Sequence, residues 1–215
     1  MSHDDFAQEP MRGLPEMPPE GEKVLWQGQP AWFALARDAL NLYWIAAYFV
    51  GFAVWRAVVA GQDAPFWEAV RIGSPFLILG AVTCGLLMVI AAIQAKTTVY
   101  TITNRRVAMR IGAALTITLN LPYRWVGNAA LARRANGTGT IALELLGNTR
   151  LSYLNTWPHV RPLHMGATQP ALRCIPDAAR VAKILADAAE TRVAEPVVAR
   201  RPVQNGPSSS AIAAE

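Results

Sequence analysis

The sequence predicts a membrane-anchored α+β protein, in which a hairpin of two transmembrane helices precedes a small domain of antiparallel strands closed by a helix. Three observations predict this class. The 215 residues are 53% hydrophobic and only 16% charged, against roughly 25% charged in an average soluble domain. Two long segments are almost free of charge, and alternating apolar residues begin soon after the second one.

The two apolar segments are 42–60, with one charged residue, and 75–95, with none. At about 1.5 Å per residue, each is long enough for the ~30 Å hydrocarbon core of a bilayer. Two buried helices of a soluble domain are the alternative, but the second segment has no position for a polar stripe. We expect residues 61–74 to be a short connector, with Phe66 and Trp67 at the membrane interface.

Basic residues predict the orientation of this hairpin. Lys96, Arg105, Arg106 and Arg110 follow the second segment, whereas the connector contains Arg71 alone. The positive-inside rule therefore places both termini in the cytoplasm. The acidic, proline-rich N-terminus lacks the apolar region of a secretory signal. We expect a multi-pass membrane protein.

Downstream of the hairpin the apolar residues alternate, which is the period of a half-buried strand. Asn104 and Arg105 offer a turn, Pro122 is expected to end a strand because it has no N–H to donate, and residues 136–139 (NGTG) offer a second turn. The strands expected on this basis are 98–103, 107–111, 115–121, 140–146 and 150–154.

A final helix is predicted from Pro176 and Asp177, which are typical of a helix start. Its apolar face comprises Val181, Ile184, Leu185 and Ala188, and we expect it to close the open end of a curved sheet. The predicted organisation is a disordered tail at 1–20, a cytoplasmic pre-membrane segment at 21–41, the hairpin at 42–95, the strand-and-helix domain at 96–192 and a disordered tail at 193–215.

Residues 95–192 carry thirteen basic and four acidic side chains. Two interpretations stay open: a docking face for anionic lipid or an acidic protein, or a solvated domain whose charge only enforces topology. Nucleic acid is not an expected partner, because no motif interleaves these arginines with aromatic residues. The candidate docking residues are Arg105, Arg106, Arg110, Arg124, Trp125, Trp157 and Arg161.

Small residues in the two apolar segments are candidates for close helix packing. They either pack the hairpin against itself, which we favour, or form a groove for a partner helix. A hairpin alone buries little surface, so we expect a homodimer or association with other transmembrane subunits. The candidate packing residues are Ala47, Gly51, Gly80, Ala81, Cys84 and Gly85.

No catalytic pattern is present in the sequence, which lacks a P-loop and the HExxH, GxSxG and CxxC motifs. We therefore expect no enzyme, no catalytic residue, no cofactor and no metal site. Cys84 and Cys174 are expected to be free thiols, because two distant cysteines are too few to cross-link a chain of this size.

Two short segments carry a resemblance to a known family. Residues 22–30 (EKVLWQGQP) and 100–106 (YTITNRR) resemble the membrane-anchored bacterial PH domains. The resemblance covers residues 21–192. It implies a PH-like fold, with a bent antiparallel sheet capped by one C-terminal helix. The lipid bilayer is an expected partner because of the two apolar segments.

A narrower resemblance is carried by residues 1–40, 121–125 (LPYRW) and 153–162 (YLNTWPHVRP). These segments are similar to the photosynthetic-complex assembly proteins of purple bacteria. The resemblance implies an intracytoplasmic-membrane scaffold for the reaction centre and the light-harvesting 1 complex, with the reaction-centre H subunit as a partner. The alternative is a lipid- or stress-sensing membrane PH protein without a photosynthetic role.

His159 and His164 raise one further possibility in that setting, since neutral imidazole can ligate the magnesium of bacteriochlorophyll. Both residues lie outside the predicted spans, beside Pro158 and Pro162. We therefore favour the interpretation that they are ordinary loop histidines.

Overall fold

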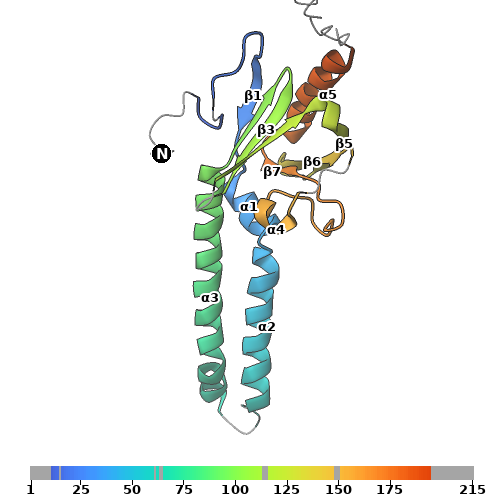
Figure 1. Cartoon of the computed structure of the whole chain (residues 1–215). Helices are drawn as coiled ribbons and strands as arrows, with labels where there is room; N and C mark the ends of the chain where they lie inside the picture. Colours follow the sequence, from blue (N-terminus) through green and yellow to red (C-terminus); the bar gives the residue numbers. More distant parts are fainter. Residues whose placement is uncertain are drawn as a thin grey trace, which may run out of the picture.

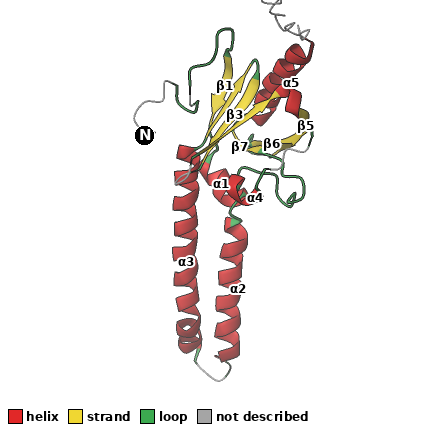
Figure 2. Cartoon of the chain, viewed as in Figure 1, coloured by secondary structure: helices red, strands yellow, loops and turns green. Residues whose placement is uncertain are grey.

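The computed structural model describes residues 11–14, 16–60, 62, 65–112, 116–147 and 151–194. It consists of a long helical hairpin and a domain of two sheets and short helices at one end of it (Figure 1; Figure 2). Within the hairpin, α2 (Leu42–Ala60) has the predicted bounds. Both α2 and α3 (Phe66–Thr97) are long and apolar enough to cross a membrane.

Helix α3 has 32 residues and begins nine residues before the predicted start at Pro75. The expectation that residues 61–74 form a connector is therefore wrong for residues 66–74, where Phe66 and Trp67 form the first turn instead. Proline 75 is accommodated because the Ser74 hydroxyl donates to the Arg71 carbonyl at 3.1 Å, the group that the missing N–H would have reached. At 1.5 Å per residue α3 is about 48 Å long, which exceeds the ~30 Å thickness of a hydrocarbon core.

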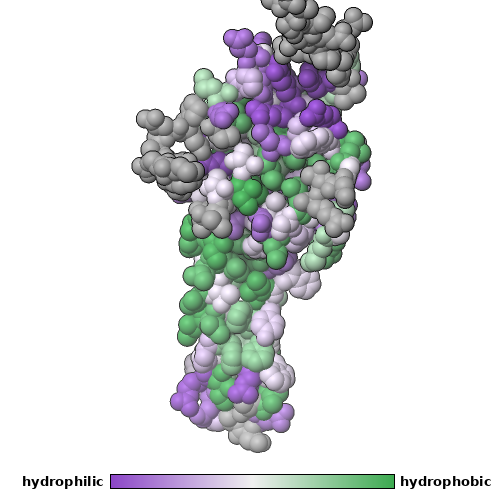
Figure 3. Space-filling model, in the orientation of Figure 1, coloured by the Kyte–Doolittle hydropathy of each residue, from purple (hydrophilic) through white to green (hydrophobic). Residues whose placement is uncertain are grey.

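The two long helices pack closely because α3 presents glycines to α2. A Cβ on Gly80 would lie 2.7 Å from Phe49 Cβ, and one on Gly73 would lie 2.9 Å from the Ala53 carbonyl oxygen. Only 11% of the apolar stretch of each long helix is buried against the rest of the chain. The outer faces of the hairpin therefore form a broad hydrophobic band, green in Figure 3.

The domain contains two antiparallel sheets, with strand orders β1-β2-β3-β4 and β5-β6-β7. Strand β1 precedes the hairpin and pairs with β2, which follows it, through Val24–Thr103 and Gly28–Tyr100. The hairpin is thus an insertion between two neighbouring strands, and the expected pre-membrane segment is part of the domain. The strands are β1 (Val24–Gly28), β2 (Val99–Thr103), β3 (Arg106–Ile111), β4 (Ile117–Pro122), β5 (Val126–Arg133), β6 (Gly139–Leu145) and β7 (Ala171–Ile175).

The predicted strands 98–103, 107–111, 115–121 and 140–146 correspond to β2, β3, β4 and β6. The first residue of the third one, Leu115, lies outside the described residues. The prediction of a strand at 150–154 is wrong for its described part, because α4 (Tyr153–Thr156) is a single helical turn and Leu154 is 82% exposed. Strand β7 pairs with β6 instead. It escaped prediction because its sequence, ALRCI, does not alternate between apolar and polar residues, and neither does that of β5, VGNAALAR.

Helix α5 (Ala178–Ala194) closes the domain with the predicted apolar face, since Val181, Leu185 and Ala188 are buried. These residues join one core with side chains from both sheets, including Tyr100 and Ile141. The PH-like fold implied by the resemblance is therefore present. A short helix, α1 (Trp32–Asp38), and a 3-10 turn, η1 (Tyr123–Trp125), complete the domain.

The N-terminal segment differs from the expected disordered tail at 1–20. Residues 11–14 form a turn in which Leu14 is 1% exposed. Gly13 has φ +84°, and a Cβ there would lie 2.5 Å from Val99 Cγ1. The Gln27 amide also donates to the Arg12 carbonyl at 2.7 Å, so this turn is part of the domain. Residues 1–10 and 195–215 lie outside the described residues.

Candidate functional site at the hairpin–domain junction

The junction is the region where α1 meets the ends of the two long helices. Ala91 and Ala95 of α3 are buried against the side of α1 that contains Leu35 and Ala36. Small residues on both helices permit this close packing. Helix α1 therefore bridges β1 and α2 while lying across the C-terminal end of α3 (Figure 1).

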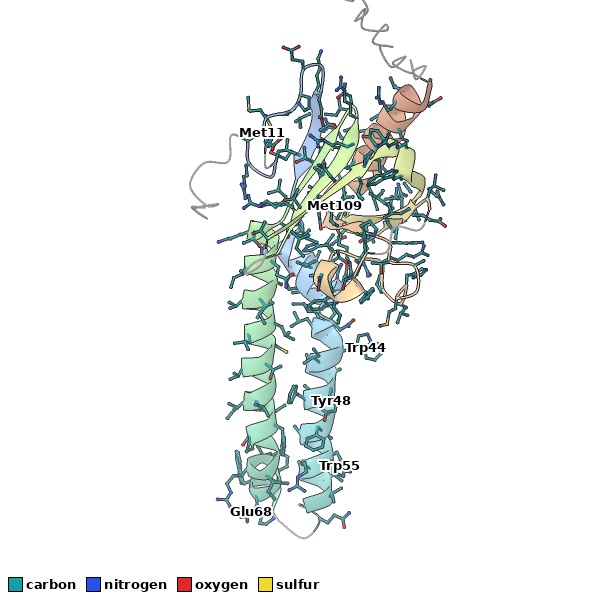
Figure 4. The ribbon with its side chains drawn as sticks, in the orientation of Figure 1. Met11, Trp44, Tyr48, Trp55, Glu68 and Met109 are labelled. Atoms are coloured by element: carbon teal, nitrogen blue, oxygen red, sulfur yellow. The ribbon has the colours of Figure 1, made fainter. Side chains whose placement is uncertain are left out.

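Exposed aromatic and apolar side chains surround the junction. Trp32 and Phe33 of α1 are 49% and 42% exposed, and Trp44, in the first turn of α2, is 79% exposed. Figure 4 shows Trp44 at the domain end of α2, with Tyr48 and Trp55 farther along the same helix. Exposed aromatic residues at the end of a long apolar helix are typical of the membrane–water interface. We call this set the junction belt: Trp32, Phe33, Tyr43, Trp44, Leu154 and Trp157.

A buried polar network lies beneath the belt. The Tyr100 hydroxyl lies 2.6 Å from His159 Nδ1, and Thr98 Oγ1 lies 3.1 Å from His159 Nε2. All three groups are satisfied when the hydroxyl of Tyr100 donates to Nδ1 and Nε2–H donates to Thr98. Burial, reinforced by the charge of Arg173, lowers the pKa of His159 to about 3. His159 is therefore neutral at physiological pH.

Arg173 connects this network to α1. Its Nη1 donates to the Pro158 carbonyl at 3.2 Å and its Nη2 to the Asp38 carbonyl at 2.9 Å. The backbone N–H of Arg173 donates to the Tyr100 hydroxyl at 3.3 Å. The side chain is almost fully buried, and its Nε has no partner among the described residues. One guanidinium thus holds β7, the end of α1 and the segment after α4 in a fixed arrangement.

Both cysteines are free. Cys174 is buried next to Arg173, and its carbonyl accepts a hydrogen bond from the Ala31 N–H at 2.8 Å. Burial raises the pKa of its thiol to about 11, so it stays protonated and is a poor nucleophile.

An open hollow of about 710 Å³ lies beside this network, between the α1–α2 corner and the turn that joins β5 to β6. The Asp38 carboxylate accepts from Arg37 Nε at 2.8 Å and from Arg134 Nε at 2.6 Å. The hydrogen bond with Asp38 raises the pKa of Arg37. We call the hollow the arginine pocket; its lining is Arg37, Asp38, Asn41, Tyr43, Trp44, Arg133, Arg134, Ala135 and Asn136.

Sequence reasoning did not select this pocket. Arg133 and Arg134 are two of the thirteen basic residues of 95–192 and carry no prediction of their own, and Arg37 lies in a different part of the chain. The adjacent arginine pair directly before a predicted turn was the one available signal. Their convergence on Asp38 required the fold, since Asp38 and Arg134 are distant in sequence.

The predicted docking residues do not form one surface. Arg105 and Arg106 lie at the β2–β3 turn, the end of the first sheet that points away from α3 (Figure 1). Arg106 Nε is 2.8 Å from Glu22 Oε1, and Arg105 Nη2 donates to the Glu20 carbonyl at 3.2 Å. Both arginines therefore attach the segment before β1 to the sheet.

The remaining docking candidates divide between the two ends of the domain. Arg124 lies 5.8 Å from the ring centroid of Trp125, and both residues are exposed on η1. Arg110 lies opposite Val99, at the hairpin end of the sheet. Trp157 belongs to the junction belt, and Arg161 Nη1 donates to Gln169 Oε1 at 3.1 Å.

Only some of the small residues of the spans pack the hairpin against itself. Gly80 packs inside the hairpin, and Cys84 lies against the cluster of buried residues that includes Ala91. The others face outward or are open: a Cβ on Gly51 or Gly85 would meet nothing within 4 Å. The exposed members one turn from these glycines are Ala47 and Ala81.

Both histidines lie in the loop that follows α4. Both ring nitrogens of His159 are engaged inside the domain. His164 Nδ1 lies 2.9 Å from the Pro162 carbonyl oxygen, within its own loop.

Comparisons with known proteins agree with this architecture. The family described as "Bacterial PH domain" matches residues 41–189. An uncharacterised 23.7 kDa protein of Rhodobacter capsulatus, described by its position in the puhA 5′ region, is 42% identical over 208 residues, which cover 94% of this chain and 95% of that protein. No solved structure matches the chain significantly. The extent of these matches, together with the two sheets and the closing helix, shows that the chain belongs to the bacterial PH domain family.

Proposed function

We propose that this protein is a non-enzymatic assembly factor of the PuhB type, which helps to build the reaction centre and the light-harvesting 1 complex. Its setting is the intracytoplasmic membrane of a purple bacterium, with both termini in the cytoplasm. The observation that carries the proposal is the near full-length similarity to a Rhodobacter capsulatus protein described by its position in the 5′ region of puhA, a photosynthesis gene. Genes that lie together often serve one assembly process.

The outer faces of the hairpin support lateral docking of partner helices. Ala47 and Gly51 lie one turn apart on α2, and Ala81 and Gly85 lie one turn apart on α3. An added Cβ on either glycine would meet nothing within 4 Å in the chain itself. Small residues at this spacing let a second helix approach closely inside a bilayer. A transmembrane subunit of the photosynthetic complexes or a second copy of this chain would fit there.

The end of the domain farthest from the hairpin supports a second contact, with a partner's surface outside the membrane. Arg124 and Trp125 are exposed there on η1, and Arg105 is exposed at the neighbouring turn. An arginine next to a tryptophan is a common anchor in protein interfaces. We assign this contact to the reaction-centre H subunit.

The chemistry of the junction supports a role in binding rather than catalysis. His159, Tyr100 and Cys174 are buried, and burial shifts the pKa of each group away from the charged form. They hold the junction together by hydrogen bonds instead of facing the arginine pocket. The pocket itself offers guanidinium groups and a carboxylate already paired with two of them.

Deletion of the gene in a photosynthetically grown purple bacterium tests the proposal. We expect lower membrane levels of the reaction centre and light-harvesting 1, measured by near-infrared absorbance, with unchanged levels of an unrelated membrane complex. Complementation with the intact gene should restore both complexes. Normal levels in the deletion strain would contradict the proposal and favour a lipid- or stress-sensing PH protein.

A matched pair of variants then tests the docking surface on α2. Gly51→Leu fills the notch that we assign to a partner helix, whereas Val50→Leu enlarges an exposed neighbour outside it. We expect Gly51→Leu to reduce recovery of photosynthetic subunits after cross-linking and affinity purification, and Val50→Leu to leave it unchanged. Equal recovery with both variants would remove the role of this notch.

A further inference from the structure

We propose that the arginine pocket binds the phosphate of an anionic phospholipid, taken from the membrane leaflet next to the domain. This inference is independent of the assembly function. It would give the PH-like domain a specific lipid contact beside the two membrane-spanning helices.

The charge of the pocket favours an anion. Three guanidinium groups line it, and the one carboxylate, that of Asp38, is already shared between Arg37 and Arg134. The side chain of Arg133 has no hydrogen-bond or ion-pair partner among the described residues. It is therefore available to bind a phosphate, and arginine does so with two parallel N–H donors.

Backbone N–H groups at the start of α2 add further hydrogen-bond donors and a partial positive charge to the pocket. The pocket includes Asn41, and the first hydrogen bond of α2 runs from the Ile45 N–H to the Asn41 carbonyl. The N–H groups of residues 42–44 therefore have no acceptor within the helix. The N-terminus of this 19-residue helix, with its partial positive charge, lies at the edge of the pocket.

The position of the pocket relative to the membrane favours a lipid as the source of the phosphate. Tyr43 and Trp44 line the pocket and also form the first turn of α2, where the apolar face of the hairpin begins. Aromatic residues at this position lie at headgroup level. A bound phosphate would thus be level with the lipid phosphates of the adjacent leaflet, and its acyl chains would extend along α2 past the exposed ring of Tyr48 (Figure 4). The volume, about 710 Å³, is large enough for a lipid headgroup.

Native mass spectrometry of the full chain tests this proposal. The protein is reconstituted in nanodiscs of phosphatidylcholine containing a minority of phosphatidylglycerol, and the lipids that stay bound after release are counted. We expect the protein to retain phosphatidylglycerol in preference to phosphatidylcholine. Arg133→Gln should lower that retention about fivefold, the effect of one arginine near an anionic surface.

Lys183→Gln is the matched control, because Lys183 is an exposed cation on α5, outside the pocket, and its loss changes the net charge equally. We expect this variant to retain phosphatidylglycerol as the unchanged protein does. Arg133 is exposed and unpartnered among the described residues, so both variants should fold. Equal retention of the two lipids by the unchanged protein, or equal losses in both variants, would overturn the proposal.

A competition arm distinguishes a lipid from free phosphate. Excess inorganic phosphate is added to the nanodisc sample at constant ionic strength. Unchanged retention of phosphatidylglycerol supports a site that recognises the lipid in the membrane. Displacement of the lipid by inorganic phosphate would show a site for soluble anions and overturn the assignment to a membrane ligand.

Discussion

The two ends of the domain use arginine in different ways. At the end away from the hairpin, Arg106 pairs with Glu22, whose side chain is 2% exposed, and so attaches the segment before β1 to the sheet. At the junction, Arg173 is buried among carbonyl groups, whereas Arg133 is open to the pocket. Both ends belong to one basic half of the chain. The comparison teaches that a basic composition reveals a possible binding face only after the arginines with internal partners are set aside.

The largest expected effect is on the buried arginine of the junction. Arg173→Ala removes the donors to the Pro158 and Asp38 carbonyls and leaves a cavity among α1, β7 and the segment after α4. We expect the free energy of unfolding of the domain to fall by about 3 kcal/mol. Thermal unfolding followed by near-ultraviolet circular dichroism in mild detergent measures this loss. Arg180→Ala on the exposed face of α5 is the control, and an equally small effect of both would show that Arg173 does not hold the junction.

The second prediction concerns the pH dependence of the same region. The pKa of His159 is about 3 in the fold, below the ordinary value of 6.5. Between these values the unfolded chain binds a proton that the folded chain does not, so the free energy of unfolding decreases as the pH falls below 6.5. The expected slope is up to about 1.4 kcal/mol per pH unit.

His159→Gln removes this titration. The difference between the pH profiles of the variant and the unchanged protein, measured by thermal unfolding between pH 7 and pH 4, isolates the contribution of His159. Parallel profiles would mean that the imidazole is protonated as readily in the fold as in the unfolded chain.

A smaller effect is expected at the distal end. Arg106→Gln leaves the buried Glu22 carboxylate without its cation, which should cost about 1 kcal/mol, because Arg106 itself is partly exposed and solvent screens the pair. Limited proteolysis of the segment before β1, together with thermal unfolding, tests this. Arg105→Gln, which loses one exposed hydrogen bond to a carbonyl, should change stability much less. A larger loss of stability in Arg105→Gln than in Arg106→Gln would contradict the structural role assigned to the Arg106–Glu22 pair.

The smallest effect is expected for the open arginine. Arg133→Gln should change the free energy of unfolding by less than about 0.5 kcal/mol, since Arg133 lies on the exposed strand β5 and its side chain has no partner among the described residues. The same variant should alter lipid retention as described above. A large loss of stability would place Arg133 with Arg173 as a structural residue.

Part of the candidate site followed from sequence reasoning and part did not. Of the exposed aromatic residues at the junction, only Trp157 was predicted, as a docking residue. The interfacial aromatic residues that the limits of the apolar segments predict, Phe66 and Trp67, begin α3 at the opposite end of the hairpin (Figure 1). The arginine pocket was not expected, because Arg37, Asp38 and Arg134 meet only when the β5–β6 turn packs beside the α1–α2 corner. The outward-facing small residues were identified by spacing, but only packing separated Gly51 and Gly85 from Gly80.

The sequence by itself determined the elements whose signals are local. An apolar segment long enough for a bilayer set the bounds of α2, strict alternation identified β2 and β4, and the apolar face of α5 follows a helical period. Only the tertiary structure decided the pairing of β1 with β2 on either side of the hairpin, the continuation of α3 through Pro75 and the exchange of a predicted strand for β7. Those outcomes depend on contacts between residues far apart in the chain, whose free energy no local pattern records.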